Sequence, residues 1–142
     1  MLKQLLENNI QVVESIDNWE EAIRYASKPL LKKKTIEDRY VRSMIDNIHE
    51  LGAYVVLMPR IAMPHSRPEN GVNITSMSLL KLNKGVSFSK DKDDINLIFI
   101  LAAGDNTSHM DAIIGLTDLL EDGEKIEEII GAANSETIYN LI

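Results

Sequence analysis

Apolar residues that recur every three or four positions predict helices over much of this chain. The clearest set comprises Tyr40, Met44, Ile48 and Leu51. These residues share one side of a helix of about four turns, which Gly52 is expected to end. After a short amphipathic opening segment, the expected helices span residues 18–31, 35–51, 105–122, 125–130 and 136–141.

Capping residues mark several of these helix starts. The sequence Asp17-Asn18-Trp19-Glu20 is typical of a capping box, and Thr35 followed by Asp38 predicts a second cap. Pro29 predicts that the first of the two helices bends or ends nearby. The helix after residue 104 has three possible caps, which are Asp105, Thr107 and Ser108.

Runs of β-branched and other apolar residues predict about four strands, at residues 10–13, 54–58, 74–82 and 95–103. The run from Leu97 to Ala103 is apolar throughout, as expected for a central strand buried on both faces. Two connections are expected between the last two strands, at Asn83-Lys84-Gly85 and at the charged segment Lys90-Asp91-Lys92-Asp93-Asp94.

Prolines interrupt the segment between the second and third strands. Pro59, Pro64 and Pro68, together with Gly71, predict an exposed and stiffened loop over residues 59–71. Helices precede, interrupt and follow the strands, so the expected fold is α/β, a layered single domain over residues 1–142 with a mixed β-sheet flanked by helices.

Composition narrows the possible functions. A formal charge of −7 disfavours nucleic-acid binding. The absence of cysteine excludes thiol chemistry and thiolate metal sites within the chain. No apolar run approaches the roughly 18 residues that a membrane span needs, and the first residues are too polar for a signal peptide. A cytoplasmic protein without direct membrane binding is therefore expected.

The candidates for chemistry are the three histidines. His49 lies on a predicted helix without turn residues around it, which favours a structural role. His65 lies in the proline-rich loop, and His109 at a helix start, where backbone amides and the helix dipole favour an anion. For these two, the residues alone leave structural and functional roles open. A metal site on His65 and His109 would lack an HExxH pair and a cysteine ligand, and Asp111 could join it only because it is near His109 in the sequence. Neither a metal nor a cofactor is therefore expected.

Two sequence blocks resemble a known family. Ile61-Ala62-Met63-Pro64-His65 resembles the active-site motif of the mannitol/fructose-type enzyme IIA domains of the sugar phosphotransferase system, that is, the type 2 enzyme IIA domains. The second block is Leu101-Ala102-Ala103, a polar turn, His109 and a Leu/Ile-rich helix ending in Glu121-Asp122. The extension Arg67-Pro68-Glu69 is most similar to the ascorbate-specific branch.

The resemblance implies a phosphotransferase with a phosphohistidine intermediate. His65 would accept a phosphoryl group from the carrier protein HPr and pass it to a cysteine of enzyme IIB, on a separate chain. The membrane enzyme IIC would be an indirect partner, and the transported sugar would be ascorbate. His109 would be the second active-site histidine, which orients or stabilises the phosphoryl group.

Other residues are expected to assist with the phosphoryl charge. The candidates are Ser66, Arg67 and Ser108. Ser66 stands where the family often has a glycine after the histidine. Asn47 stands where mannitol-like members usually have a helix arginine, and Arg67 could take over the charge of that arginine. Met63 and Met110 either form a small docking patch for partners or belong to the core.

Two other functions remain open at this level. One is a regulatory phosphoacceptor of the same fold, which controls a transcription factor or kinase. The other is a module that binds a metal or small anion through His65 and His109 without a covalent step.

Overall fold

The structure is a computed structural model that describes residues 2–90 and 94–142. Asp91, Lys92 and Asp93, from the expected charged connection, lie outside the described residues. The elements in chain order are α1 (Leu2–Leu6), β1 (Ile10–Val13), α2 (Trp19–Lys32), α3 (Asp38–Leu51), β2 (Val56–Met58), β3 (Ile61–Ala62), the 3-10 helix η1 (Pro68–Asn70), β4 (Ser76–Val86), β5 (Ile95–Ala102), α4 (Asn106–Leu120), α5 (Gly123–Ile130) and α6 (Ser135–Leu141).

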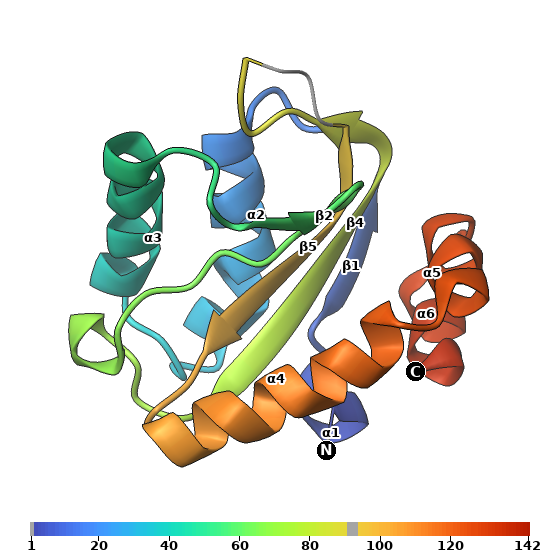
Figure 1. Ribbon diagram of the computed structural model, residues 1–142. Coiled ribbons are helices and arrows are strands. Elements are labelled where there is room, and N and C mark those ends of the chain that lie inside the picture. Colours follow the sequence, from blue (N-terminus) through green and yellow to red (C-terminus); the bar gives the residue numbers. More distant parts are fainter. Residues whose placement is uncertain (1, 91–93) are drawn as a thin grey trace.

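The strands form a mixed sheet in the order β1-β4-β5-β3-β2 (Figure 1). β1 is parallel to β4 and β3 is parallel to β5, whereas the pairs β4–β5 and β2–β3 are antiparallel. Every residue of β5 is buried, which confirms the predicted central strand. The predicted α/β fold with a mixed sheet is also confirmed.

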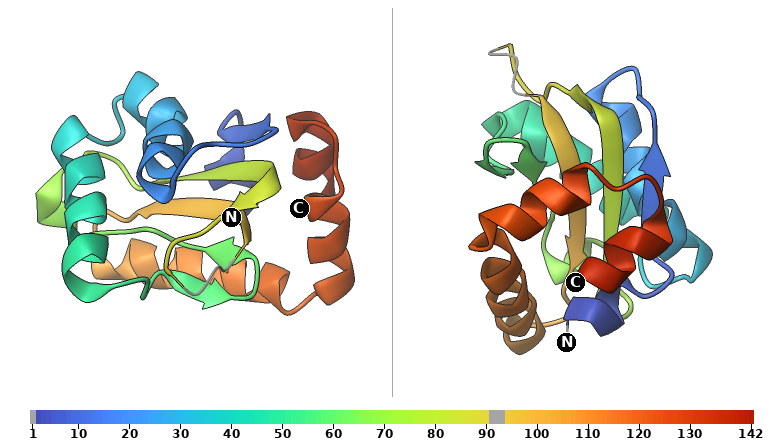
Figure 2. Two further views of the ribbon diagram at one scale, coloured as in Figure 1. Left: turned by 90° about the horizontal axis from the view of Figure 1, so that it is seen from above. Right: turned by 90° about the vertical axis from the view of Figure 1, so that its right-hand side faces the viewer.

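Helices pack on both faces of this sheet because the side chains of β4 and β5 alternate between two apolar clusters. Leu80 and Ile98 belong to the cluster that includes residues of α2 and α3. Leu79 and Phe99 belong to the cluster that includes residues of α1, α4, α5 and α6. Figure 2 shows α2 and α4 on opposite sides of the sheet.

The predicted loop at residues 59–71 is wrong in one part, because it contains the strand β3. Ile61 and Ala62 are fully buried and pair with Leu97 and Ile98 of β5. The sequence does not predict this two-residue strand, because prolines flank it on both sides and because it depends on long-range pairing with β5. η1 adds a helical turn at Pro68–Asn70.

Three other predicted boundaries shift. The strand expected at 54–58 is confined to Val56–Met58. β4 continues through the expected turn at 83–85 to Val86, with a register shift against β5. Thr35 is not the cap of α3, because that helix has Glu37 at its N-cap and the Thr35 hydroxyl donates to the carbonyl of Leu30 at 3.3 Å.

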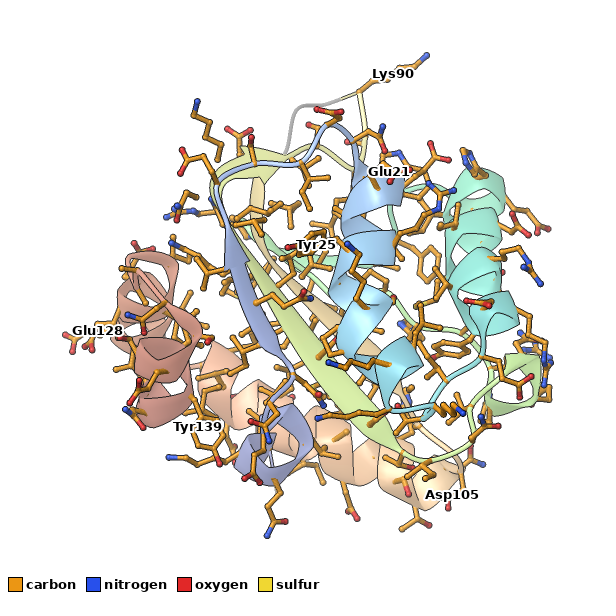
Figure 3. All side chains as sticks on the ribbon, turned by 180° about the vertical axis from the view of Figure 1, so that it is seen from behind. Glu21, Tyr25, Lys90, Asp105, Glu128 and Tyr139 are labelled. Atoms are coloured by element: carbon orange, nitrogen blue, oxygen red, sulfur yellow. The ribbon has the colours of Figure 1, made fainter. Side chains whose placement is uncertain are left out.

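Pro29 lies inside α2, which continues to Lys32. A proline has no N–H for the carbonyl four residues earlier, which is that of Tyr25. The side-chain amide of Gln11 in β1 donates to this carbonyl at 2.9 Å. A side chain of the sheet thus supplies the hydrogen bond that Pro29 cannot make. Figure 3 labels Tyr25 on α2.

Gly71 allows η1 to lie directly against α3. Its φ is +132°, and an added Cβ would lie 3.1 Å from both the Cβ and the backbone nitrogen of Tyr40. Backbone atoms of a helix do not move aside easily, so a side chain at residue 71 would separate the two segments.

We expect Gly71→Ala to lower the free energy of unfolding by about 1–3 kcal/mol, because it combines backbone strain with this clash. Chemical denaturation measures the change. Gly123→Ala is the matched control, since a Cβ there meets nothing within 4 Å and needs no left-handed backbone. Equal losses in the two variants would contradict the role given to Gly71.

Candidate functional site

His65 and His109 meet at the end of β5. His65 forms an isolated parallel bridge with Leu101, and the amide of Leu101 donates to the carbonyl of Pro64 at 3.2 Å. α4 begins shortly after β5 and brings His109 to the same edge of the sheet. The two imidazole ring centroids lie 6.2 Å apart, with the planes inclined at 55°.

A backbone hydrogen bond fixes the tautomer of His65. Its Nδ1 lies 3.0 Å from the carbonyl oxygen of Met63, and a carbonyl only accepts, so Nδ1 donates. In the neutral ring Nε2 then holds the free lone pair. The half-buried imidazole thus keeps its nucleophilic nitrogen away from the Met63 carbonyl.

Tyr40 joins three segments behind His65. From α3, its hydroxyl donates to the carbonyl of Leu101 at 2.6 Å and accepts from the backbone N–H of Ser66 at 3.0 Å. Burial raises the pKa of Tyr40 to about 12, and the hydrogen bond with Ser66 opposes this rise. The phenol is therefore neutral at ordinary pH and fixes the His65 loop between α3 and β5.

Hydrogen bonds within the protein use the full donor and acceptor capacity of the Ser66 hydroxyl. It accepts from the side-chain amides of Asn47 at 3.2 Å and Asn70 at 2.9 Å, and it lies 2.6 Å from the hydroxyl of Ser43. Two acceptor sites are then filled, so the Ser66 hydrogen points to Ser43. Asn47 thus contacts the His65 loop through Ser66.

Successive side chains in extended backbone point to opposite sides, and the contacts of His65 and Ser66 follow this rule. His65 meets His109 of α4, whereas Ser66 meets Ser43 and Asn47 of α3. The Ser66 side chain therefore holds the loop from the face opposite His65.

The start of α4 already has an anionic group of its own. The carboxylate of Asp105 caps the helix and accepts from the backbone N–H of Ser108 at 2.7 Å. Hydrogen bonds from the backbone and side chain of Ser108 lower the pKa of Asp105. Figure 3 labels Asp105 at this end of α4. The amide of Ser108 is thus engaged with Asp105, and the amide of His109 donates to the Asp105 carbonyl at 3.0 Å.

Arg67 and Glu69 lie at the surface beside His65. In the part of the chain that the structure describes, the guanidinium of Arg67 has no hydrogen-bond or ion-pair partner. The backbone carbonyl of Glu69 accepts from Arg39 at 2.8 Å, which ties η1 to α3. Arg67 is thus the candidate with a free charged group near the site.

The two methionines have different environments. Met63 is 4% exposed and belongs to the core, which is the second of the two roles that the sequence left open for it. Met110 is 57% exposed on α4, one residue after His109, and Ile114 lies one turn further at 55%. These two residues form an exposed apolar stripe next to the histidine pair.

His49 is separate from this pair. Its Nε2 lies 3.2 Å from a carboxylate oxygen of Glu20, and its ring packs 5.0 Å from that of Trp19, both on α2. Among residues 2–90 and 94–142, no group of three or more His, Asp or Glu side chains is placed to hold a metal ion. No helix in this described part has the length and apolar character that crossing a bilayer requires.

Comparison with known proteins identifies the family. The family model described as phosphoenolpyruvate-dependent sugar phosphotransferase system, EIIA 2, matches residues 3–142. The chain belongs to this family, and it is an enzyme IIA component, a phosphotransferase, of the sugar phosphotransferase system.

Particular relatives resemble the chain over nearly its whole length. The mannitol-specific cryptic phosphotransferase enzyme IIA component of Escherichia coli K12 is 37% identical over 136 residues, which are 96% of this chain and 92% of that protein. A solution structure with this description has a TM-score of 0.92 at 35% identity, covering 99% of this chain and 96% of that one. The ascorbate-specific EIIA component of the same strain is 31% identical over 141 residues, which are 97% and 92% of the two chains.

One similar structure contains a partner protein. The complex of enzyme IIAMTL with phosphorylated enzyme IIBMTL from Escherichia coli matches with a TM-score of 0.81 and 29% identity, covering 94% of this chain and 92% of that one. The comparisons do not single out ascorbate, because the mannitol-specific relative is at least as similar as the ascorbate-specific one.

The site residues that the sequence analysis missed are Tyr40 and Tyr54. Tyr40 was predicted only as part of the apolar side of a helix, and Tyr54 only as the start of a strand. The ring of Tyr54 lies 6.0 Å from that of His65, with the planes inclined at 79°. No local pattern marks either contact, because both depend on how the 59–71 segment lies against α3.

We expect the stability contributed by Tyr40 to depend on pH in the alkaline range. Its folded pKa is about 12 against an ordinary value of 10.0, so the unfolded chain loses this proton first as the pH rises. The contribution is complete below about pH 10 and falls by roughly 2–3 kcal/mol as the pH rises through about 12.

Denaturation curves at neutral and alkaline pH measure this effect in wild type and Tyr40→Phe. At neutral pH the variant should lose about 1–3 kcal/mol, because two buried polar groups lose their partner. The difference from wild type should then shrink as the pH rises. Tyr139→Phe is the control and should follow wild type. Parallel pH curves for Tyr40→Phe and wild type would refute the assignment.

Proposed function

We propose that this chain is a phosphocarrier that accepts a phosphoryl group from phospho-HPr on Nε2 of His65 and passes it to a cysteine of an enzyme IIB protein. The observation that supports this most is the hydrogen bond from Nδ1 of His65 to the Met63 carbonyl. It leaves Nε2 as the nitrogen with a lone pair, which a nucleophile requires.

Two displacements at phosphorus make up the reaction. In the first, the lone pair of Nε2 forms a bond to phosphorus while the bond between phosphorus and the donor imidazole breaks, and that electron pair returns to the donor nitrogen. In the second, the thiolate of enzyme IIB attacks phosphorus and the bonding pair returns to Nε2 of His65. These 142 residues contain no cysteine, so the thiolate would have to come from outside them, as the proposed enzyme IIB acceptor supplies.

His109 and Arg67 are the groups we assign to the phosphoryl oxygens. His109 lies in ring contact with His65, and Arg67 has an uncommitted guanidinium on the same loop. A loose transition state spreads negative charge over the oxygens, where positioned donors stabilise it. The Ser66 hydroxyl is engaged with Ser43 and the Ser108 amide with Asp105, so we assign these two residues to holding the site in place.

Donor and acceptor proteins are expected to share one surface. Each must bring its reacting atom in line with Nε2 of His65, so the two partners exclude each other. The stripe of Met110 and Ile114 offers an adaptable apolar contact beside the site. The relative that is solved in complex with phosphorylated enzyme IIBMTL supports this choice of acceptor.

Transport of ascorbate is the finer part of the proposal. It is supported by the Arg67-Pro68-Glu69 segment and by the ascorbate-specific relative. Arg67 and Glu69 are exposed beside His65, where a partner protein would contact them. The sugar itself would be bound by the IIC partner, because this chain transfers only the phosphoryl group.

Phosphorylation with labelled phosphoenolpyruvate, enzyme I and HPr tests the central role of His65. We expect His65→Ala to gain no acid-labile label and to keep its free energy of unfolding within about 1 kcal/mol of wild type, since the side chain is only half-buried. His49→Ala should be labelled like wild type. Normal labelling of a folded His65→Ala protein would remove His65 from the mechanism, and an unlabelled wild type would favour the non-covalent alternative.

His109→Ala should still accept label, but on the order of a hundredfold more slowly in one or both transfers, because a group that stabilises the phosphoryl oxygens is lost. Rapid-quench measurements of label gain from phospho-HPr and of label loss to enzyme IIB separate the two steps. Unchanged rate constants for both steps would return His109 to a structural role.

A further inference from the structure

The imidazole of His65 contacts a second aromatic ring, that of Tyr54, in addition to His109. The ring centroids of Tyr54 and His65 lie 6.0 Å apart and the planes are inclined at 79°, which is an edge-to-face arrangement. Tyr54 follows α3, whereas His109 belongs to α4, so the two contacts reach the imidazole from different elements.

The backbone around Tyr54 is joined to the segment that orients His65. The amide of Tyr54 donates to the carbonyl of Gly52 at 2.9 Å, which closes a tight turn. The next residue, Val55, is buried and accepts from the amide of Met63 at 2.8 Å. Met63 in turn provides the carbonyl to which Nδ1 of His65 donates. Tyr54 and the acceptor for Nδ1 are therefore held in one hydrogen-bonded frame.

An imidazole has a broad preference about its χ2 angle, so a single hydrogen bond restrains its rotation only in part. Rotation about χ2 would remove Nδ1 from the Met63 carbonyl and turn Nε2 away from an incoming phosphoryl group. A ring that packs edge-to-face adds a second restraint with a preferred angle. In-line transfer depends on this angle, because a small misplacement of the nucleophile costs rate.

We propose that Tyr54 is a positioning residue for phosphoryl transfer, whose ring holds the His65 imidazole so that Nδ1 donates to Met63 and Nε2 faces the partner. The inference rests on the proposed function of His65. The restraint comes from the aromatic ring, so phenylalanine should replace tyrosine at this position.

The test compares Tyr54→Leu, Tyr54→Phe and wild type with two phosphoryl donors. Phospho-HPr reports on the complete reaction, and phosphoramidate, a small donor whose leaving group is ammonia, reports on the chemical step without a partner protein. We expect Tyr54→Leu to lower the rate constant about three- to tenfold with both donors, the range of an aromatic pair contact. Tyr54→Phe should restore most of the rate. Tyr139→Leu, on α6, is the control for the same chemical change away from His65.

The ¹⁵N chemical shifts of the His65 ring provide a second readout. Wild type and Tyr54→Phe should show one dominant tautomer with the proton on Nδ1, whereas Tyr54→Leu should shift toward the average of the two tautomers. A change in general stability alone would not move these shifts in the folded protein.

Each contrary result has a distinct meaning. A folded wild-type protein that gains no phosphoryl group from either donor defeats the proposed function itself. A normally labelled wild type with an equally fast Tyr54→Leu variant overturns only the positioning role. The role is also overturned if Tyr54→Leu is slow with phospho-HPr but normal with phosphoramidate, which would make Tyr54 a docking residue. Equal losses in Tyr54→Phe and Tyr54→Leu would assign the effect to the hydroxyl and overturn the ring restraint.

Discussion

The hydroxyl of Tyr40 is the contact on which the geometry of the site depends. This hydroxyl donates to the carbonyl of Leu101 in β5 and accepts from the amide of Ser66, while the ring of Tyr40 lies in the core. An irregular segment with several prolines has few backbone partners of its own. The buried phenol satisfies groups from two segments at once, and it thereby sets how far the His65 loop lies from the sheet.

Around this contact, the two faces of one extended stretch of chain have different tasks. The side chain of Ser66 is saturated by Ser43, Asn47 and Asn70, all of which lie on α3 or η1. The neighbouring side chain of His65 meets rings from α4 and from the turn after α3. Rigid attachment through Ser66 leaves the side of His65 free for the proposed chemistry, so two adjacent residues would serve stability and reactivity separately.

The elements with a strong local pattern could be predicted from the sequence, and those made by long-range pairing could not. The apolar period of α3 and the uninterrupted apolar run of β5 each reflect burial that the element itself encodes. β3 has two residues and exists because Leu97 and Ile98 lie beside it. Thr35 has the chemistry of a cap but bonds to Leu30 instead, because α3 begins only at Asp38.

The same distinction holds at the site. His65 and His109 could be proposed as site residues because the two sequence blocks that resemble the family are local, and the fold brings the two rings together. Tyr40 and Tyr54 were missed because a tyrosine on an apolar helix side, or at a strand start, has the same local pattern whether or not a loop packs on it. Met63 and Met110 looked equivalent in sequence, yet one lies in the core and the other at the surface. Only the fold decides which side of α4 faces the sheet and whether the residue after β3 is buried.

The capping of α4 by Asp105 has an energetic consequence for a phosphocarrier of the kind proposed. An open helix start beside His65 would bind the phosphoryl oxygens and deepen the energy well of the phosphorylated state. Here a carboxylate of the protein already occupies the Ser108 amide and adds a negative charge nearby. In the proposed function, this arrangement would keep the phosphorylated protein from being over-stabilised. The group-transfer potential of phospho-His65 would then stay close to that of its donor and acceptor, so the phosphoryl group could be transferred in either direction with little loss of free energy.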